Sequence, residues 1–143
     1  MSAGNTFEND LLSLIFTATA IANIADDAAS APLTNLYISL HTSDPGEAGD
    51  QTTNEATYTS YARVAVARTT GGWTVSSGTV SNDAAVDFPE CTGGSNTITH
   101  VAVGTASSGS GKLLISGALS SSLAVSSGIT PSFAIGALQF NVD

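Results

Sequence analysis

Hydrophobic positions recur at two different periods along this chain, and the change falls near residue 35. In "NTFENDLLSLIFTATAIANIA" (residues 5–25), apolar side chains follow the 3.6-residue period of an α-helix. Asn5 and Glu8 form a start that resembles a capping box, with Asn in place of the usual Ser or Thr. We therefore predict an N-terminal amphipathic helix whose stripe either covers its own domain or docks on a neighbouring subunit. The stripe comprises Phe7, Leu11, Leu14, Ile15 and Ala18.

After residue 35 the apolar period changes to two, which is typical of half-buried strands. "LYISLHT" (36–42) sets Leu36, Ile38 and Leu40 against polar neighbours. Short segments of similar character follow, bounded by Gly, Ser, Asn, Asp or Pro: "YARVAVAR", "GGWTVSSG", "AAVDFPE", "TITHVAVGTA", "KLLISGAL", "SLAVSSG" and "SFAIGALQFNVD". The last has the clearest alternation.

This order of segments predicts a mainly β fold, an antiparallel β-sandwich of jelly-roll or Ig-like type with an N-terminal α-helix. It also predicts two parts. Residues 1–34 form a helix and linker arm, and residues 35–143 form the β-sandwich domain.

The charge balance excludes several classes of partner. The net charge is −9, and Arg63, Arg68 and Lys112 are the only cations. Binding to nucleic acid or to an anionic membrane needs several Lys or Arg residues, so neither is expected. Only 10% of the residues are charged, and Ser and Thr together outnumber them. Such a surface suits a subunit packed into an assembly, plausible as a homo-oligomer and even as a trimer.

The two arginines flank the apolar "VAVA" segment in a strongly acidic chain. We expect Arg63 and Arg68 to pair with carboxylates, within the fold or across a subunit contact, where Arg is a common hot spot. Together with Phe7, Leu11, Leu14 and Ile15 of the helical stripe, they are the predicted interaction residues.

The N-terminus has no basic region ahead of its apolar run, and no apolar stretch reaches 18 residues. We expect a protein that is made and folded in a cytoplasm. Cys91 is the only cysteine, so the fold has no intrachain disulfide, and a buried apolar role is expected for the thiol.

The loop "HTSDPGEAGDQ" (41–51) raises the question of a metal site. Asp44, Glu47 and Asp50 lie three residues apart, which is not the spacing of an EF-hand, although loop oxygens can hold Ca²⁺ weakly. The Asp-Pro-Gly sequence favours a polar turn, and we predict neither a metal nor a cofactor. Two histidines, His41 and His100, with one Cys do not make a zinc set, and we expect hydrogen-bonded strand histidines.

No pattern of a catalytic centre is present. There is no G-x-S-x-G elbow, and "GTASSGSGK" (104–112) departs from the phosphate-loop pattern at two positions. Spacing alone leaves a glycosidase-like carboxylate pair open, but nothing predicts a cleft. Trp73, Tyr58 and Tyr61 offer a sugar-stacking platform, yet a lone Trp in "GGWTVSSG" is more typical of a sandwich core. The chain is predicted not to be an enzyme.

Taken in order, the segments "FENDLLSLIF", "LYISLHTSDPGEAGD", "YARVAVA", "VDFPECTG", "ITHVAVGTASSG" and "LLISGALSSSLAVSSG" resemble a family of small structural proteins of tailed bacteriophages, often labelled tail fibre proteins. The most specific part is "LYISLHTSDPGEAGD" followed by "YARVAV". One departure is "TYTSYAR", which replaces a Gly-rich approach to the Tyr-Ala-Arg strand.

This resemblance implies a virion component whose partners are other phage structural proteins. The compact size and weak charge favour a capsid decoration (cement) protein, bound to the major capsid protein on the outside of the head. A tail protein, either a short fibre or a tube-associated subunit, is the alternative. A carbohydrate-binding sandwich is a third and weaker one.

Overall fold

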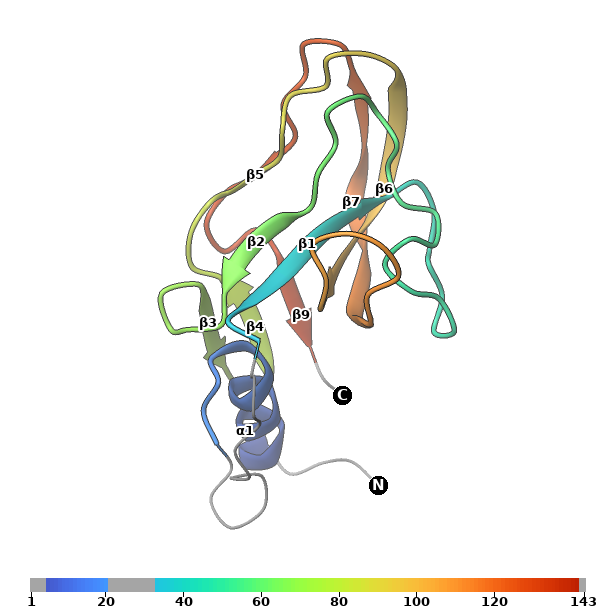
Figure 1. Cartoon of the computed structure of the whole chain (residues 1–143). Coiled ribbons are helices and arrows are strands. Elements are labelled where there is room, and N and C mark those ends of the chain that lie inside the picture. The colour runs from blue at the N-terminus through green and yellow to red at the C-terminus, as the bar shows by residue number, and fades with distance from the viewer. Residues whose placement is uncertain (1–4, 21–32, 142–143) are drawn as a thin grey trace. The chain divides into compact units, whose positions relative to one another are not determined.

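The computed structural model describes residues 5–20 and 33–141, without the side chains of residues 5–7. It contains one helix and nine strands within these ranges (Figure 1). They are α1 (Asn5–Phe16), β1 (Asn35–His41), β2 (Val64–Ala67), β3 (Trp73–Ser76), β4 (Thr79–Asn82), β5 (Val86–Asp87), β6 (Ser95–Gly104), β7 (Leu113–Ser126), β8 (Ser132–Phe133) and β9 (Gln139–Asn141). All the strand pairings recorded among them are antiparallel, which confirms the predicted fold class.

The chain divides into two compact units that each draw on separate stretches of sequence. The first comprises Met1–Asn35, Ala67–Ala85 and Ala134–Asp143, and the second comprises Leu36–Val66 and Val86–Phe133. The predicted division into residues 1–34 and 35–143 stays a prediction.

In the first unit, α1 packs on a three-stranded sheet of order β3-β4-β9. The deepest helical residues are Leu12 and Phe16, and the Phe16 ring meets Trp73 edge to face at 4.7 Å between centroids. The helix therefore packs within its own chain. Its most buried face is not the predicted stripe, because Leu11, Leu14 and Ile15 are only half-buried.

The helix ends at Phe16, well before residue 25. Both the backbone N–H and the hydroxyl of Thr17 donate to the Ser13 carbonyl, at 2.9 and 2.8 Å. Ala18 then adopts a positive φ of 54°, a conformation that stops an α-helix. Ala18 is exposed beyond the helix end, so it is not part of the helical stripe.

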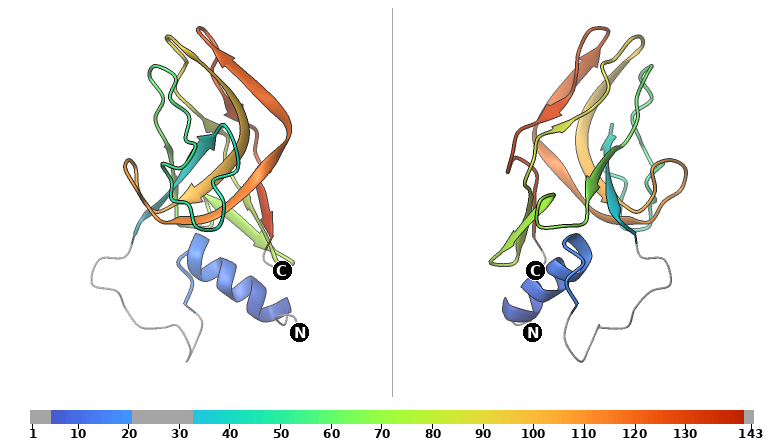
Figure 2. Two further views of the ribbon diagram at one scale, coloured as in Figure 1. Left: turned by 90° about the vertical axis from the view of Figure 1, so that its right-hand side faces the viewer. Right: turned by 60° about the vertical axis from the view of Figure 1, so that its left-hand side comes forward.

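The second unit holds a four-stranded sheet of order β2-β1-β6-β7 and a two-stranded ribbon of β5 and β8. In Figure 2, β6 and β7 run side by side in both views. Ile38, Leu40 and Ile98 of β1 and β6 are fully buried. Ser39 and His41 on the other face of β1 are buried as well, so β1 is covered on both faces and is not the half-buried strand that its alternation predicts. From the ribbon side, Phe88 stacks on Tyr61 and meets Phe133, so sheet and ribbon form a sandwich-like arrangement.

Three strand predictions were wrong in detail. The segments "KLLISGAL" and "SLAVSSG" belong to one continuous strand, β7. The segment "SFAIGALQFNVD" is interrupted between β8 and β9 by a turn in which Gly136 has a φ of +71°. The strand β4 was not predicted as an element of its own.

Candidate functional site

The acidic loop after β1 is built by local turn chemistry. The carboxylate of Asp44 accepts a hydrogen bond from the Gly46 N–H at 2.9 Å, and Gly46 has a φ of +71°, which Gly tolerates best. At Gly49 an added Cβ would overlap the Pro45 carbonyl oxygen, so no larger residue fits there. These contacts explain why a Pro, two Gly and an Asp occur together in "SDPGEAG".

The carboxylate of Asp50 closes the second half of this loop. It accepts hydrogen bonds from the Thr52 N–H at 2.8 Å and the Thr52 hydroxyl at 2.6 Å, and these bonds lower the pKa of Asp50. Both Asp44 and Asp50 thus act as turn-capping acceptors. Within residues 5–20 and 33–141, no group of three or more His, Cys, Asp or Glu side chains is arranged to hold a metal ion.

His41 lies at the end of β1 with its ring fully buried. Its Nε2 lies 2.8 Å from the Ser39 hydroxyl, and its Nδ1 lies 2.8 Å from the Thr53 carbonyl oxygen. Burial lowers the pKa of His41 from its usual 6.5, so the imidazole is neutral at pH 7. Since a carbonyl oxygen is present only as an acceptor, Nδ1 carries the proton and Nε2 accepts from Ser39.

This Ser–His pair has the distance of a nucleophile and base but not the setting of a catalytic one. Both residues are 0% exposed, and a carbonyl oxygen occupies the place that a carboxylate takes in a catalytic triad. His100, opposite His41 in the β1–β6 ladder, is half-buried and hydrogen-bonded to the Thr99 hydroxyl at 2.9 Å. Both histidines are therefore hydrogen-bonded strand residues, as the sequence predicts.

A buried ion pair joins the loop to the Tyr-Ala-Arg segment. Arg63 Nε and Nη2 donate to the two carboxylate oxygens of Glu55 at 2.6 and 2.8 Å, and the Arg63 side chain is 2% exposed. Its remaining hydrogen bonds reach the carbonyl oxygens of Ala106 and Gly109, at 2.9 and 2.8 Å. The Tyr61 hydroxyl donates to Glu55 at 2.9 Å and accepts from the Leu40 N–H at 3.0 Å. The Glu55 hydrogen bonds raise the pKa of Arg63, and burial raises that of Tyr61.

Gln51 completes this network with a side chain that is 0% exposed. Its Oε1 accepts from the Ala106 N–H at 2.9 Å, and its backbone N–H donates to the Gly111 carbonyl at 3.1 Å. A Cβ added at Gly104 or Gly111 would overlap the Gln51 side chain, so these two glycines make room for it. The "GTASSGSGK" segment is thus a loop held by Gln51 and Arg63.

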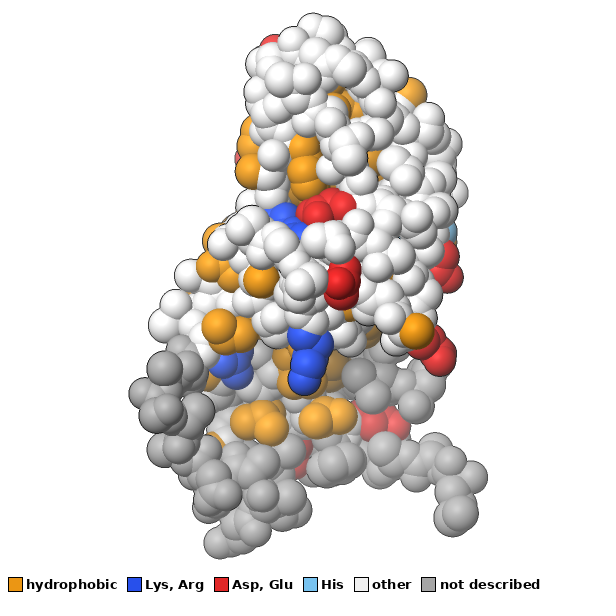
Figure 3. Space-filling model, turned by 45° about the vertical axis from the view of Figure 1, so that its right-hand side comes forward, with side chains coloured by type: hydrophobic (Ala, Val, Ile, Leu, Met, Phe, Trp, Pro, Cys, Tyr) orange, Lys and Arg blue, Asp and Glu red, His pale blue; other side chains and the backbone are white. Residues whose placement is uncertain are grey.

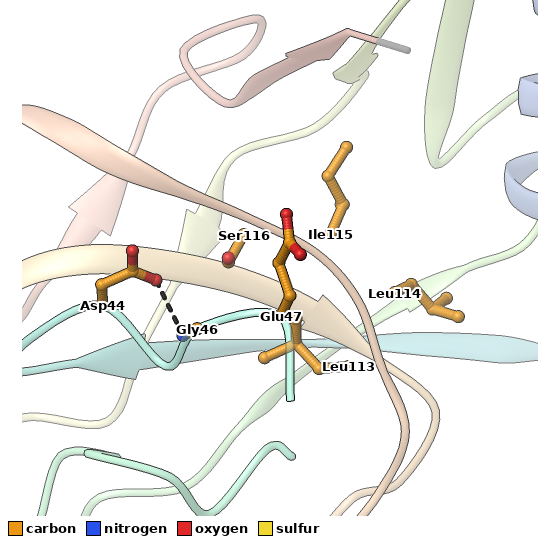
Figure 4. A pocket seen from close by; sticks show the side chains of 7 residues that line it. All are labelled: Asp44, Gly46, Glu47, Leu113, Leu114, Ile115 and Ser116. Atoms are coloured by element: carbon orange, nitrogen blue, oxygen red, sulfur yellow. Dashed lines mark hydrogen bonds between the residues drawn. The ribbon is translucent and has the colours of Figure 1, made fainter. Parts of the chain in front are cut away.

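The outer side of the acidic loop borders a surface hollow of about 410 Å³. Figure 4 shows Glu47 and Asp44 on one side of it and the start of β7 on the other. The β7 wall is mainly apolar, with Leu113, Leu114 and Ile115 ahead of Ser116. We call this feature the acidic hollow.

Arg68 belongs to the first unit and has a different role from the predicted one. Its guanidinium donates to the carbonyl oxygens of Ile15, Leu33 and Leu14 at 2.6, 2.7 and 2.8 Å. Among the described residues, Arg68 thus pairs with carbonyl oxygens and not with a carboxylate. It satisfies groups that the end of a helix leaves without partners.

The prediction of a carboxylate partner is confirmed for Arg63. For Arg68 it is not met among the described residues, where the partners are carbonyl oxygens. The role of both arginines in subunit contacts, and that of Leu11, Leu14 and Ile15, stays a prediction. The side chain of Phe7, the remaining predicted interaction residue, lies outside the described residues.

Trp73 is a core residue, as the sequence favours, and the alternative of a sugar-stacking platform does not form. Trp73 is 1% exposed in the core of the first unit, and Tyr58 is 3% exposed, with its hydroxyl bonded to the Pro89 carbonyl. Tyr61 is half-buried and turned toward Glu55. Cys91 is fully buried, as expected.

Two buried polar residues, Gln51 and Asn82, and the half-buried Glu55 carry this architecture but were not singled out from the sequence. The sequence does contain a signal for Glu55, because charged residues are rare in this chain, at only 10%. One of the three cations, Arg63, follows Glu55 by eight residues. Gln51 and Asn82 give no such signal.

Comparison with known protein families gives a match. The sequence profile of a protein family described as podophage GP4 fiber I protein gp80 matches residues 2–141, nearly the whole chain. No curated protein matches the chain. Among the described residues, no helix is long and apolar enough to cross a membrane.

Proposed function

Since the chain belongs to the family described as podophage GP4 fiber I protein gp80, a family of phage virion structural proteins, we propose that it is a non-enzymatic subunit of a virion fibre. The single observation that carries this proposal is the family match over residues 2–141. The description of the family favours the fibre over other places in the particle.

The role of the specific motifs supports a structural function. His41, Tyr61 and Arg63 belong to "LYISLHT" and "YAR", and each is used for internal hydrogen bonding. Ser39 and His41, the pair closest to a catalytic arrangement, have no solvent access. A buried hydrogen-bond network of this kind holds a surface loop in place, here the acidic loop, and contains no reacting group.

We propose the acidic hollow as a contact point for another virion protein. Asp44 and Glu47 line it beside the apolar start of β7, so a partner segment with a Lys or Arg next to apolar residues would complement it. Such a contact needs no enzyme chemistry.

Decoration of the head is the second candidate. It is favoured by the weakly charged surface, since the face in Figure 3 carries few and scattered charged groups. A surface of this kind suits close packing of many copies on an existing lattice. The major capsid protein would then be the partner, in place of tail proteins.

Quantitative mass spectrometry of purified virions tests the proposal, with cryo-electron microscopy of the same particles to locate the protein. A copy number far below that of the major capsid protein, with density at the tail, supports the fibre. A copy number that approaches that of the major capsid protein, with density on the head, supports decoration instead. Absence of the protein from purified particles would overturn both.

A further inference from the structure

The strand β7 is an edge of its sheet with unusual properties. It ends the order β2-β1-β6-β7 and pairs only with β6 among the described residues. It is 14 residues long, "LLISGALSSSLAVS", and contains no charged residue and no Pro. Natural proteins usually protect an exposed edge by short length, Lys, Pro or a covering element. By sequence, β7 is open to addition of another strand.

The middle of β7 also has backbone that β6 does not pair. Ile98 lies opposite Leu123 and His100 opposite Ala118, so four residues of β7, Leu119–Ser122, face a single residue of β6. Ser120, Ser121 and Ser122 are exposed. At this bulge, Leu119–Ser122 have no partner in the β6 register, within the described part of the chain.

The sequence of β7 is nearly a palindrome about Ser121. Read outward from this residue, Ser120 matches Ser122, Leu119 matches Leu123, Ala118 matches Ala124 and Ser116 matches Ser126. The one mismatch over residues 116–126 is Gly117 against Val125. In an antiparallel pair each residue i faces a residue j, so a palindromic strand places like residues opposite each other when it pairs with itself.

From these observations we propose that β7 is a homodimerisation strand that pairs antiparallel with β7 of a second copy, around a two-fold axis at Ser121. Leu119 of each copy then faces Leu123 of the other, and the Ser residues face one another. The interface is isologous, as a two-fold axis requires. The backbone groups of Leu119–Ser122 gain partners by strand addition.

The charge distribution favours a second copy over an unrelated strand. The chain carries a net charge of −9, so a contact between two copies through faces that carry carboxylates would bring like charges together. β7 is a 14-residue stretch where two copies can meet with no charge at all. Self-association on this strand therefore places no charged residue of β7 against another.

The first test uses the purified full chain in analytical ultracentrifugation. The wild-type mass should be twice 14.3 kDa. Ser121→Lys places two ammonium groups against each other at the axis and should convert the protein to monomer, with association weakened at least about tenfold. Ser108→Lys adds the same charge at an exposed loop position and should leave the dimer intact. A wild-type monomer, a trimer, or a dimer indifferent to Ser121→Lys overturns the proposal.

The second test does not depend on a destabilising change. Residues opposite each other in an antiparallel pair have Cα atoms about 4.5–5.5 Å apart, within the range that a disulfide spans. Ser121→Cys should therefore form a disulfide-linked dimer under mild oxidation, while Ser108→Cys should not. The native Cys91 is buried and does not compete. Failure of Ser121→Cys to cross-link faster than Ser108→Cys overturns the two-fold register.

This inference deepens the proposed virion role and rests on it only for its biological setting. Both tests use isolated protein, so a monomer in solution contradicts the dimer and leaves the place in the virion untouched. Absence from virions contradicts the proposed function and leaves the dimer untouched.

Discussion

The guanidinium of Arg63 forms a two-pronged ion pair with the carboxylate of Glu55, with N–O distances of 2.6 and 2.8 Å, across eight residues of chain. The same guanidinium donates to two carbonyl oxygens of the 105–111 loop. One side chain therefore joins three segments of the second unit, and its planar fork is required for all of these bonds.

Arg63→Ala should destabilise the second unit by about 3–5 kcal/mol, because it leaves the Glu55 carboxylate without its charged partner in a nearly buried place. Arg63→Lys keeps the charge but not the fork, and it should recover only part of the loss. Urea unfolding followed by circular dichroism measures both. Equal stability of wild type and Arg63→Ala would contradict a structural role for the ion pair.

Protonation of His41 should make the fold sensitive to mild acid. Burial lowers the folded-state pKa of His41 below 6.5, so the unfolded chain binds a proton more readily than the folded one. The contribution of the neutral His41 to the free energy of unfolding is fully present above pH 6.5. It decreases as the pH falls below that value, with a slope of at most about 1.4 kcal/mol per pH unit. Stability measured between pH 7.5 and 5.5 should therefore decrease.

The matched variants for this prediction are His41→Gln and Ser108→Gln. His41→Gln removes the titrating group and should flatten the pH dependence over this range, even if the variant is less stable throughout. Ser108→Gln changes an exposed loop position without a titratable group and should retain the wild-type slope. An unchanged slope in His41→Gln would assign the acid sensitivity to other groups.

Gly104 and Gln51 should show strong energetic coupling. An alanine Cβ at position 104 would overlap the buried Gln51 side chain, and the resulting overpacking should cost about 1–3 kcal/mol. In the background of Gln51→Ala, the same Gly104→Ala change should cost much less, because the space is free. A double-mutant cycle from chemical denaturation measures the coupling.

Gly117→Ala is the control for this cycle. Nothing lies within 4 Å of an added Cβ at Gly117, so the change should be nearly neutral in either background. Strict additivity of Gly104→Ala and Gln51→Ala would show that Gln51 does not occupy the space beside Gly104.

The sequence predicted those elements whose signals are local. The strand β1 and the turn after it follow from the alternation of Leu36, Ile38 and Leu40 and from the Asp-Pro-Gly chemistry, all within one short segment. The fold class follows from the repetition of such segments.

The last segment shows why the alternation misled. Residues 132–143 alternate as a strand would, but the Asn82 amide donates to the Ala134 carbonyl at 2.9 Å and accepts from the Leu138 N–H at 2.9 Å. These bonds hold a turn between β8 and β9. Asn82 lies more than fifty residues away in sequence, so no local pattern can reveal this competition.

The candidate site was also predictable only where its signals are local. The loop and the Tyr-Ala-Arg segment stood out by motif, whereas their connection runs through Glu55 and Gln51, whose partners are set by tertiary structure. The helix shows a similar limit. Its longest apolar stripe contains Leu11 and Leu14, yet the two residues that the sheet covers are Leu12 and Phe16.

Arg68 should control the local stability of α1. Its three hydrogen bonds reach the carbonyl oxygens of Leu14 and Ile15, at the helix end, and of Leu33. A cation at this end also interacts favourably with the helix dipole. Arg68→Ala should therefore destabilise α1 by about 1–2 kcal/mol, seen as amide exchange about 5–30 times faster in the last turn of the helix.

Lys112→Ala removes the same charge elsewhere and should leave this exchange unchanged, and Arg68→Lys should restore only part of the protection. Hydrogen-exchange mass spectrometry resolves the helix from β1, which should keep its wild-type protection in all three variants. Unchanged exchange at the helix end in Arg68→Ala would mean that the sheet contacts of Leu12 and Phe16 alone hold α1, since these are the other contacts that the helix makes near that end.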